Sequence, residues 1–203
     1  MRTFIALELP AHIQQQVAQL QKQLQSYLRD LAMPECMNWT PVAKIHLTLR
    51  FLGDTSQDQQ KVITAGLPQA GLTQSAFPLT LAKLGCFPNF REPNVVWLDV
   101  QGDLPALLHL QAQTEQLAQA AGFAAEKRTF SPHITIGRAR RDANRTDLRR
   151  TGEALKTFLG ENATQQRGMP RFDTFVIDQL VYMQSELRPE GARYTALGHY
   201  PLQ

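Results

Sequence analysis

Two short segments of the chain share a pattern of residues that can transfer protons. His46-Leu47-Thr48-Leu49 and His133-Ile134-Thr135-Ile136 each place a histidine and a threonine two residues apart, between aliphatic residues. Residues two apart in a strand lie on the same face, so each segment would present an imidazole and a hydroxyl together while its aliphatic side chains face a core. Because imidazole titrates near neutrality, one histidine of a pair can donate a proton while the other accepts one. The pattern predicts general acid–base chemistry.

Phosphodiester cleavage needs this division of labour. One histidine would deprotonate the attacking water and the other would protonate the departing ribose oxygen, and the Thr48 and Thr135 hydroxyls could donate hydrogen bonds to the non-bridging phosphate oxygens. A strained cyclic phosphate would suit a site without a metal ion. A single histidine of this kind is more often a hydrogen-bonded strand residue than a catalytic one. The occurrence of two copies, one in each half of the chain, favours the catalytic interpretation.

The remaining residues do not predict a metal site or a cofactor. There is no His-Glu-x-x-His segment and no close cysteine pair, and Asp54 is the one acidic residue near either motif. The widely separated Cys36 and Cys86 are expected to be reduced thiols. His12, His109 and His199 lie outside the repeated pattern and receive no functional role.

The two motifs occur in two stretches of similar organisation. In each, an apolar strand leads into Leu-Pro-Ala (residues 9–11 and 104–106), a helix follows, and the chain returns through the histidine motif. This order predicts a duplicated α+β lobe with a cleft between the copies. The expected strands are 3–8, 45–52, 79–87, 95–100, 133–137, 175–183 and 194–200, and the expected helices begin at Pro10, near Ser56 and after Asp103. The first helix should bury Ile13, Val17, Leu20, Leu24, Tyr27 and Leu31.

Composition and charge limit the class of protein. A chain of 203 residues with 43% hydrophobic content can form one large domain or two joined lobes. No signal peptide or membrane-spanning run is present, so a cytoplasmic protein that does not enter the membrane is expected, and nothing demands more than a monomer. The net charge is +3. Positive charge is concentrated in the segment 138–150, which contains Arg138, Arg140, Arg141, Arg145, Arg149 and Arg150. Such a run is either a solvated surface or a phosphate-binding element.

Residues 46–53 and 132–136 resemble the paired motifs of the 2H phosphoesterases. Within this superfamily the chain is most similar to the bacterial and archaeal RNA 2′,3′-cyclic phosphodiesterases, once described as 2′-5′ RNA ligases. Residues 2–10, 95–98 and 193–195 also fit that family, so the resemblance covers nearly the whole chain. It implies one bilobal domain over residues 1–203, with two antiparallel sheets flanking a central cleft and helices on the outside.

The resemblance also implies an activity and roles for individual residues. The activity is hydrolysis of a terminal 2′,3′-cyclic phosphate on RNA, or on a related nucleotide, to a 2′-phosphate. His46 matches the proton donor and His133 the proton acceptor. Arg138 matches an arginine near the substrate phosphate, and Tyr194 is similarly placed. The stretch from 139 to about 166 is a basic insertion relative to compact relatives, and we hypothesise that it grips RNA.

Three other functions are compatible with the same residues. Reversible 2′-5′ RNA ligation would run the ring opening backwards, with a ribose 5′-hydroxyl as nucleophile or leaving group. A non-catalytic RNA-binding module would need only positive charge and stacking residues, so the two His-Thr pairs argue against it. Hydrolysis of small cyclic nucleotides is not excluded by the sequence.

Overall fold

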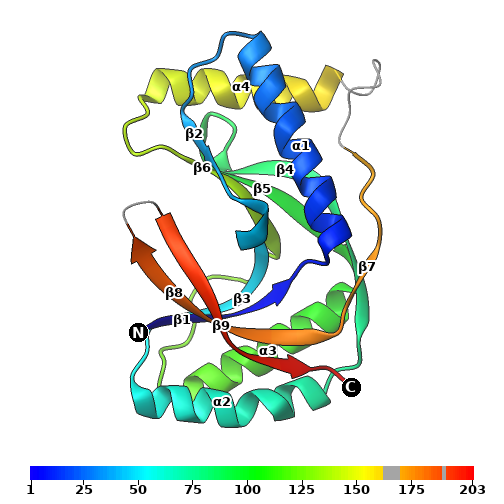
Figure 1. Cartoon of the computed structure of the whole chain (residues 1–203), viewed down its shortest axis with the longest axis vertical. Coiled ribbons are helices and arrows are strands. Elements are labelled where there is room, and N and C mark those ends of the chain that lie inside the picture. Colours follow the sequence, from blue (N-terminus) through cyan, green and yellow to red (C-terminus); the bar gives the residue numbers. More distant parts are fainter. Residues whose placement is uncertain (162–169, 189–190) are drawn as a thin grey trace.

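The computed structural model describes residues 1–161, 170–188 and 191–203 (Figure 1). Its elements combine helices and antiparallel strands, which confirms the predicted α+β class. In chain order they are β1 (Arg2–Glu8), α1 (Ala11–Asp30), β2 (Met37–Trp39), a 3-10 helix (Val42–Lys44), β3 (His46–Asp54), α2 (Gln57–Leu72), β4 (Phe77–Asn89), β5 (Glu92–Gly102), α3 (Leu104–Ala120), β6 (His133–Ala139), α4 (Arg145–Glu161), β7 (Phe175–Ile177), β8 (Gln179–Arg188) and β9 (Gly191–Pro201).

The strands form two halves of related order. One half runs β3-β1-β8-β9 and the other runs β6-β5-β4-β7, so that the strand carrying each histidine motif lies at the inner end of its half. Instead of the two separate sheets that we expected, the halves are joined where β3 pairs with β6, and the result is one curled antiparallel sheet (Figure 1). The aliphatic residues of both motifs enter the same core at this joint.

The helices lie on the outside of the curled sheet in two pairs. Helices α1 and α4 pack on each other and α4 packs on β5, whereas α2 and α3 pack on each other and α3 packs on β3 (Figure 1). The helix that follows β5 therefore covers the half that contains β3. The two stretches of related sequence are thus interleaved in space rather than stacked as independent lobes.

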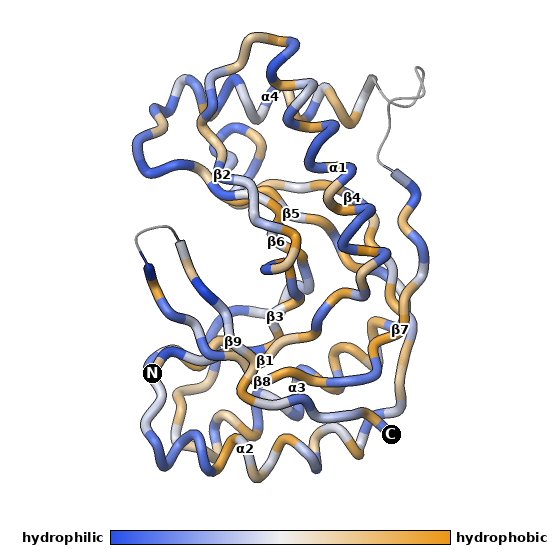
Figure 2. Tube along the Cα trace, in the orientation of Figure 1, coloured by the Kyte–Doolittle hydropathy of each residue, from blue (hydrophilic) through white to orange (hydrophobic). Residues whose placement is uncertain are grey.

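Burial follows the periodicity of the sequence with one shift. Helix α1 buries Ile13, Val17, Leu20, Gln21, Leu24 and Leu28. Leu31, which was expected to face the core, lies in the turn after the helix and is exposed, and Leu28 takes its place. Figure 2 shows hydrophobic residues along the central strands, with hydrophilic residues alternating along the outer helices. A second small cluster of Phe4, Ala6, Val181 and Met183 lies against the half-buried Tyr194.

Capping residues define several helix ends. Ser56 accepts a hydrogen bond from the Gln59 amide, and the Gln59 side chain accepts one from the Ser56 amide, which is a capping box at the start of α2. Asp103 caps α3 as predicted, since its side chain accepts from the Ala106 amide at 3.0 Å. Gly122, with φ of +85°, ends the same helix.

The basic insertion is largely helical. Helix α4 occupies Arg145–Glu161 and packs against β5, while residues 162–166 of the predicted insertion lie outside the described residues. None of the helices in the described ranges has the length and apolar character that crossing a bilayer requires.

Candidate active site

The two histidine motifs meet where the halves of the sheet are joined. Leu47 of β3 pairs with Ile134 of β6 in antiparallel register. In such a register the residue before one partner lies across from the residue after the other, so His46 lies opposite Thr135 and Thr48 lies opposite His133. The four polar residues are half-buried, whereas Leu47 and Ile134 are buried in the core. The predicted alternation of faces is therefore present, and the structure brings the two motifs together.

Both imidazole rings are held in the same way. Nδ1 of His46 donates to the Lys44 carbonyl oxygen at 2.9 Å, and Nδ1 of His133 donates to the Ser131 carbonyl oxygen at 2.8 Å. A carbonyl oxygen can only accept, so each Nδ1 carries a hydrogen, and this assigns the tautomer. In the neutral ring, Nε2 is then the atom that can exchange a proton with a ligand. The two rings are equivalently prepared for acid–base chemistry.

An aromatic cluster surrounds His46. Its ring stacks on Phe4 with centroids 4.8 Å apart, and Tyr194 of β9 meets it edge-on at 5.2 Å. Tyr194 also meets Phe4 edge-on at 5.2 Å. Tyr194, which the sequence placed at the site, therefore contacts a motif histidine. Phe4 was not predicted there, because the pairing of its strand β1 with β3 is a property of the folded sheet.

A second aromatic cluster surrounds His133. Phe87 meets its ring edge-on at 5.0 Å, Trp97 meets it edge-on at 6.3 Å, and Phe87 and Trp97 stack on each other at 4.9 Å. The Trp97 indole lies directly over Gly85, where a Cβ would clash with the ring. The sequence did not single out Phe87 or Trp97 for this role. Phe87 on β4 and Trp97 on β5 lie near His133 because β4, β5 and β6 are neighbours in the sheet.

Arg138 of β6 acts on the histidine of the other motif. Burial lowers the pKa of His46 below its ordinary value, the hydrogen bond to Lys44 opposes this change, and the positive charge of Arg138 lowers the pKa further. Arg138 is exposed and forms no ion pair within the described part of the chain. A free guanidinium thus lies near His46, where it could meet an anionic ligand.

The two threonine hydroxyls are also available to a ligand. Neither Thr48 nor Thr135 makes a side-chain hydrogen bond within the described ranges, although both are half-buried. A half-buried hydroxyl without a protein partner is a ready donor to an anion. Each hydroxyl lies on the same strand face as the histidine of its own motif and across the joint from the other histidine.

The remaining histidines and the two cysteines belong to neither motif. His12 on α1, His109 on α3 and His199 on β9 are exposed and belong to neither motif. Cys36 and Cys86 are buried and unpaired, and burial raises the pKa of Cys86 to about 12. Among residues 1–161, 170–188 and 191–203, no group of three His, Cys, Asp or Glu side chains is arranged to hold a metal ion.

Comparison with known proteins places these motifs in a family. Residues 9–184 match the 2′-5′ RNA ligase superfamily. An RNA 2′,3′-cyclic phosphodiesterase of Methanothermobacter thermautotrophicus is 27% identical over 194 residues, which is 96% of this chain and 95% of that protein. An enzyme of the same name from Aeropyrum pernix is 36% identical over 93 residues, 46% of this chain and 52% of the relative.

Solved structures share the fold of this chain. A protein of Thermus thermophilus superposes with a TM-score of 0.72 at 23% identity, covering 100% of this chain and 98% of the other. Escherichia coli LigT, solved in complex with 3′-AMP, superposes with a TM-score of 0.68 at 25% identity, covering 99% of this chain and 97% of LigT. The match over residues 9–184 shows that the chain belongs to the 2′-5′ RNA ligase superfamily of 2H phosphoesterases.

Proposed function

We propose that this protein hydrolyses the 2′,3′-cyclic phosphate at the end of an RNA to a 2′-phosphomonoester by metal-independent acid–base catalysis. The observation that carries the proposal is the antiparallel joint of the two motifs, which places His46 opposite Thr135 and His133 opposite Thr48. Both rings have Nδ1 bound to a backbone carbonyl, which leaves Nε2 for proton transfer. The names of the relatives from Methanothermobacter thermautotrophicus and Aeropyrum pernix support the same activity.

The reaction requires one proton to be taken up and one to be supplied. In the proposed scheme, Nε2 of His133 accepts a proton from water as the water oxygen bonds to phosphorus. The bond between phosphorus and the 3′-oxygen breaks, and His46 donates a proton to that oxygen. The product carries a 2′-phosphate and a free 3′-hydroxyl. The Thr48 and Thr135 hydroxyls donate to the non-bridging oxygens, and Arg138 balances their negative charge.

The lowered pKa of His46 bears on its proposed role as proton donor, because a bound substrate would change that pKa. The free protein favours the neutral form of His46 near neutral pH, whereas a proton donor must be charged. A bound phosphate anion favours the charged imidazolium and would raise this pKa, in opposition to Arg138. Protonation of His46 would thus accompany binding of the anion.

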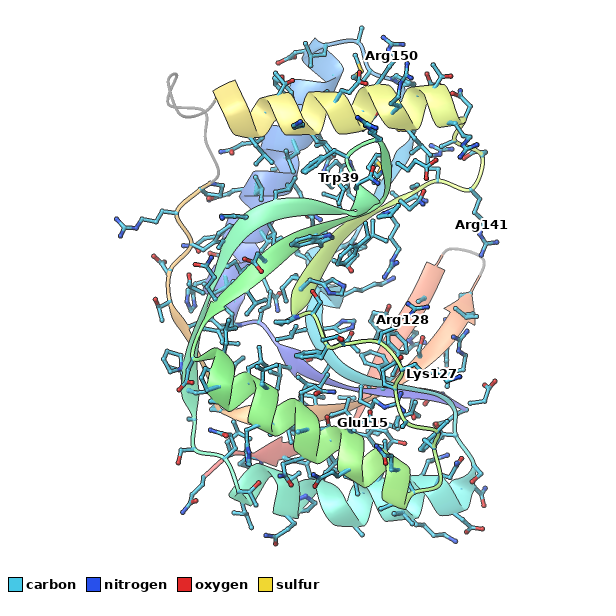
Figure 3. All side chains as sticks on the ribbon, turned by 180° about the vertical axis from the view of Figure 1, so that it is seen from behind. Trp39, Glu115, Lys127, Arg128, Arg141 and Arg150 are labelled. Carbon is cyan, nitrogen blue, oxygen red and sulfur yellow. The ribbon has the colours of Figure 1, made fainter. Side chains whose placement is uncertain are left out.

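Unpaired cations around the site favour an RNA strand over a small cyclic nucleotide. Lys127 and Arg128, in the loop before β6, and Arg141, after it, are exposed, and none has an ion pair within the described residues. Figure 3 shows Lys127 and Arg128 on that loop and Arg141 beyond β6, whereas Arg150 lies on α4 away from them. Unpaired cations of this kind suit the phosphates of a single strand.

Three arginines of the basic insertion have acidic partners. Arg140 pairs with Asp142, Arg145 pairs with Glu92, and Arg149 pairs with Glu153. These partners reduce the positive charge that the sequence pattern suggested for the segment. The role of the insertion in gripping RNA therefore stays a prediction, and it rests chiefly on Arg141, because Arg150 lies on α4 away from the cations of the loop before β6.

Reversible 2′-5′ ligation is the second candidate, supported by the name of the superfamily. The same two histidines could serve it, with a ribose 5′-hydroxyl in place of water.

We further propose that residues 1–203 act as one monomeric bilobal unit in the cytoplasm. A non-catalytic RNA-binding role predicts that binding survives loss of both histidines and that no turnover is found.

The decisive experiment measures turnover of an oligoribonucleotide that ends in a 2′,3′-cyclic phosphate, in the presence of EDTA. The wild type should yield a 2′-phosphate, and His46→Ala and His133→Ala should each lose at least about 10²-fold in rate. A 2′-5′ linked product in the presence of a 5′-hydroxyl RNA would assign ligation instead. Inactivity without metal, or full activity of both variants, would exclude the proposed mechanism.

A further inference from the structure

A buried arginine links the strand of the first motif to the loop before the second. Arg50 lies four residues after His46 on β3 and is 8% exposed. Its guanidinium donates to the Phe51 carbonyl oxygen at 2.6 Å and to the Ala124 carbonyl oxygen at 2.5 Å. The contact with Ala124 joins residues that are 74 positions apart in the chain. Neither the acid–base scheme nor the phosphate contacts use this side chain.

Glu115 of α3 completes the link. Its Oε2 lies 2.6 Å from Nε of Arg50, and since the two atoms lack the alignment of a hydrogen bond, the contact is an ion pair. Its other oxygen, Oε1, accepts from the Gln119 side chain at 2.9 Å and from the Glu126 amide at 3.0 Å. Burial raises the pKa of Glu115, but the hydrogen bonds and the charge of Arg50 outweigh this effect and hold the pKa below its usual range. Glu115 is therefore a carboxylate at neutral pH.

The loop held by this pair leads directly to His133. Residues 123–132 connect α3 to β6 without regular secondary structure. Arg50 holds the loop at Ala124, Glu115 holds it at Glu126, and Glu126 Oε1 accepts from the Arg128 amide at 3.1 Å. Figure 3 shows Glu115 on α3 near the part of the loop that carries Lys127 and Arg128. The loop ends at Ser131 and Pro132, and the Ser131 carbonyl receives Nδ1–H of His133.

The segment before the first motif is in turn held by hydrogen bonds to the strand of the second motif. The side chain of Gln21 donates to the Thr40 carbonyl at 2.8 Å and to the Ile136 carbonyl of β6 at 2.9 Å. The Thr40 amide also donates to the Ile136 carbonyl at 2.9 Å. The segment before His46 is thus tied to the strand of His133, and the loop before His133 is tied to the strand of His46. Such cross-bracing suits two groups that must keep one relative geometry.

We infer that Arg50 and Glu115 are positioning residues that hold the 123–132 loop so that the Ser131 carbonyl fixes the Nδ1–H form of His133. A loop without regular secondary structure needs side-chain partners to keep one conformation. If the loop shifts, the Ser131 carbonyl moves away from Nδ1, and the neutral imidazole can exchange its proton between the two nitrogens. Nε2 of His133 would then no longer be reserved as proton acceptor. The catalytic part of this inference rests on the proposed function.

The test compares Glu115→Gln and Arg50→Lys with the wild type. Glutamine keeps the shape of Glu115 without its charge, and lysine keeps the charge of Arg50 but cannot reach the same set of acceptors. Nitrogen-15 NMR of the His133 ring reports which nitrogen carries the hydrogen, and amide exchange reports protection of residues 123–132. Ile63→Val, in the buried part of α2, is the control for a general loss of stability.

We expect both variants to lose the pure Nδ1–H signature of His133 and to show faster amide exchange in the loop. Their kcat should fall by between about 10- and 100-fold with KM changed by less than about 2-fold, because a misplaced catalytic group affects the chemical step more than binding. The kcat of Arg50→Met should fall further than the kcat of Arg50→Lys. The Ile63→Val protein should keep the wild-type ring signature and kcat.

The outcomes separate this inference from the proposed function. A wild type without phosphodiesterase turnover overturns the proposed function, and the NMR comparison still decides whether the pair positions His133. An active wild type whose Glu115→Gln and Arg50→Lys variants retain the Nδ1–H signature and kcat overturns the positioning role. Equal effects in Ile63→Val would assign the changes to stability and overturn it as well.

Discussion

Leu47 of β3 pairs with Ile134 of β6, and this pair joins the two halves of the sheet at the site where the two motifs meet. Both side chains are buried in the common core, and each is flanked by the histidine and threonine of its own motif. The same contact therefore contributes to folding and sets the spacing of the motif histidines and threonines. A change at this pair should affect stability and activity together.

Leu47→Ala tests this coupling. Loss of a buried leucine side chain should lower the free energy of unfolding by about 2–5 kcal/mol. At a temperature where the variant is still folded, kcat/KM should fall by at least about 10-fold because the motifs lose their spacing. Leu67→Ala, at a fully buried position of α2, is the control and should lose stability without that loss of activity. Equal activity of the two variants would show that the joint does not position the site.

Removal of the motif hydroxyls should weaken transition-state binding. Thr48→Val and Thr135→Val keep the side-chain shape but remove the hydrogen-bond donor. We expect each to lower kcat by about 10²-fold, the order found when one donor to a developing negative charge is removed. Thr64→Val, at an exposed position of α2, should leave kcat unchanged. If the motif variants changed only KM, the hydroxyls would serve ground-state binding and the assigned role would be wrong.

The titration of His46 should depend on Arg138. In the free protein, NMR should show the His46 ring titrating below 6.5, because burial and the charge of Arg138 disfavour the imidazolium. Arg138→Ala should move the midpoint upward, and a bound nucleoside 2′-phosphate should do the same. A midpoint that does not respond to Arg138→Ala would contradict the electrostatic contact. Lys61→Ala, on α2, is the control and should leave the midpoint unchanged.

The same depressed pKa has a consequence for stability. In the unfolded chain His46 regains a pKa near 6.5, so as the pH falls it binds a proton at a higher pH than the folded form does. Its contribution to the free energy of unfolding is therefore complete above pH 6.5 and decreases as the pH falls toward the folded-state pKa. Denaturant unfolding of the wild type and of His46→Phe should be measured between about pH 5 and 7.5. The free energy of unfolding should depend less steeply on pH in the variant than in the wild type.

Gly85→Ala should displace Trp97. The added Cβ would meet the indole ring, which now stacks on Phe87 and contacts His133. We expect a changed emission spectrum of Trp97, measured in a Trp39→Phe background that leaves one of the two tryptophans, and a lower kcat. Gly160→Ala, where nothing lies within 4 Å of the added atom, is the control. An unchanged spectrum in Gly85→Ala would contradict the close packing of the indole.

The loop cations should matter for RNA but not for a mononucleotide. Lys127→Ala and Arg128→Ala should raise KM for an oligonucleotide with a cyclic phosphate end, and each should reduce the slope of log KM against log salt concentration by about 0.7 per lost phosphate contact. Hydrolysis of a cyclic mononucleotide should not change. Arg150→Ala removes an exposed cation of α4 and should have no such effect. Equal behaviour of the three variants would indicate a general effect of net charge.

Local patterns in the sequence predicted α1, α2, α3, most of the strands and the histidine and threonine of each motif, whereas β2 and α4 were not predicted and Arg138 and Tyr194 came from the family resemblance. The period of the aliphatic residues placed α1, the strand alternation put His46 and Thr48 on one face, and the Leu-Pro-Ala segments marked the duplication. These features depend on residues that are close in the chain, and secondary structure responds to them directly. Boundaries were less well predicted: α2 continues through Pro68 to Leu72, and the strand expected over 175–183 is divided into β7 and β8.

The tertiary structure decided which distant residues meet. The pairing of Leu47 with Ile134, the ring contacts of Phe4 and Phe87, and the link from Arg50 to Glu115 join positions whose separation no local pattern reports. Strand partners and registers are chosen by the packing of the whole core, because a hydrophobic face can be buried against several alternatives of similar local energy. The sequence therefore determined the chemical groups and their faces, and the folded chain determined their partners, spacing and support.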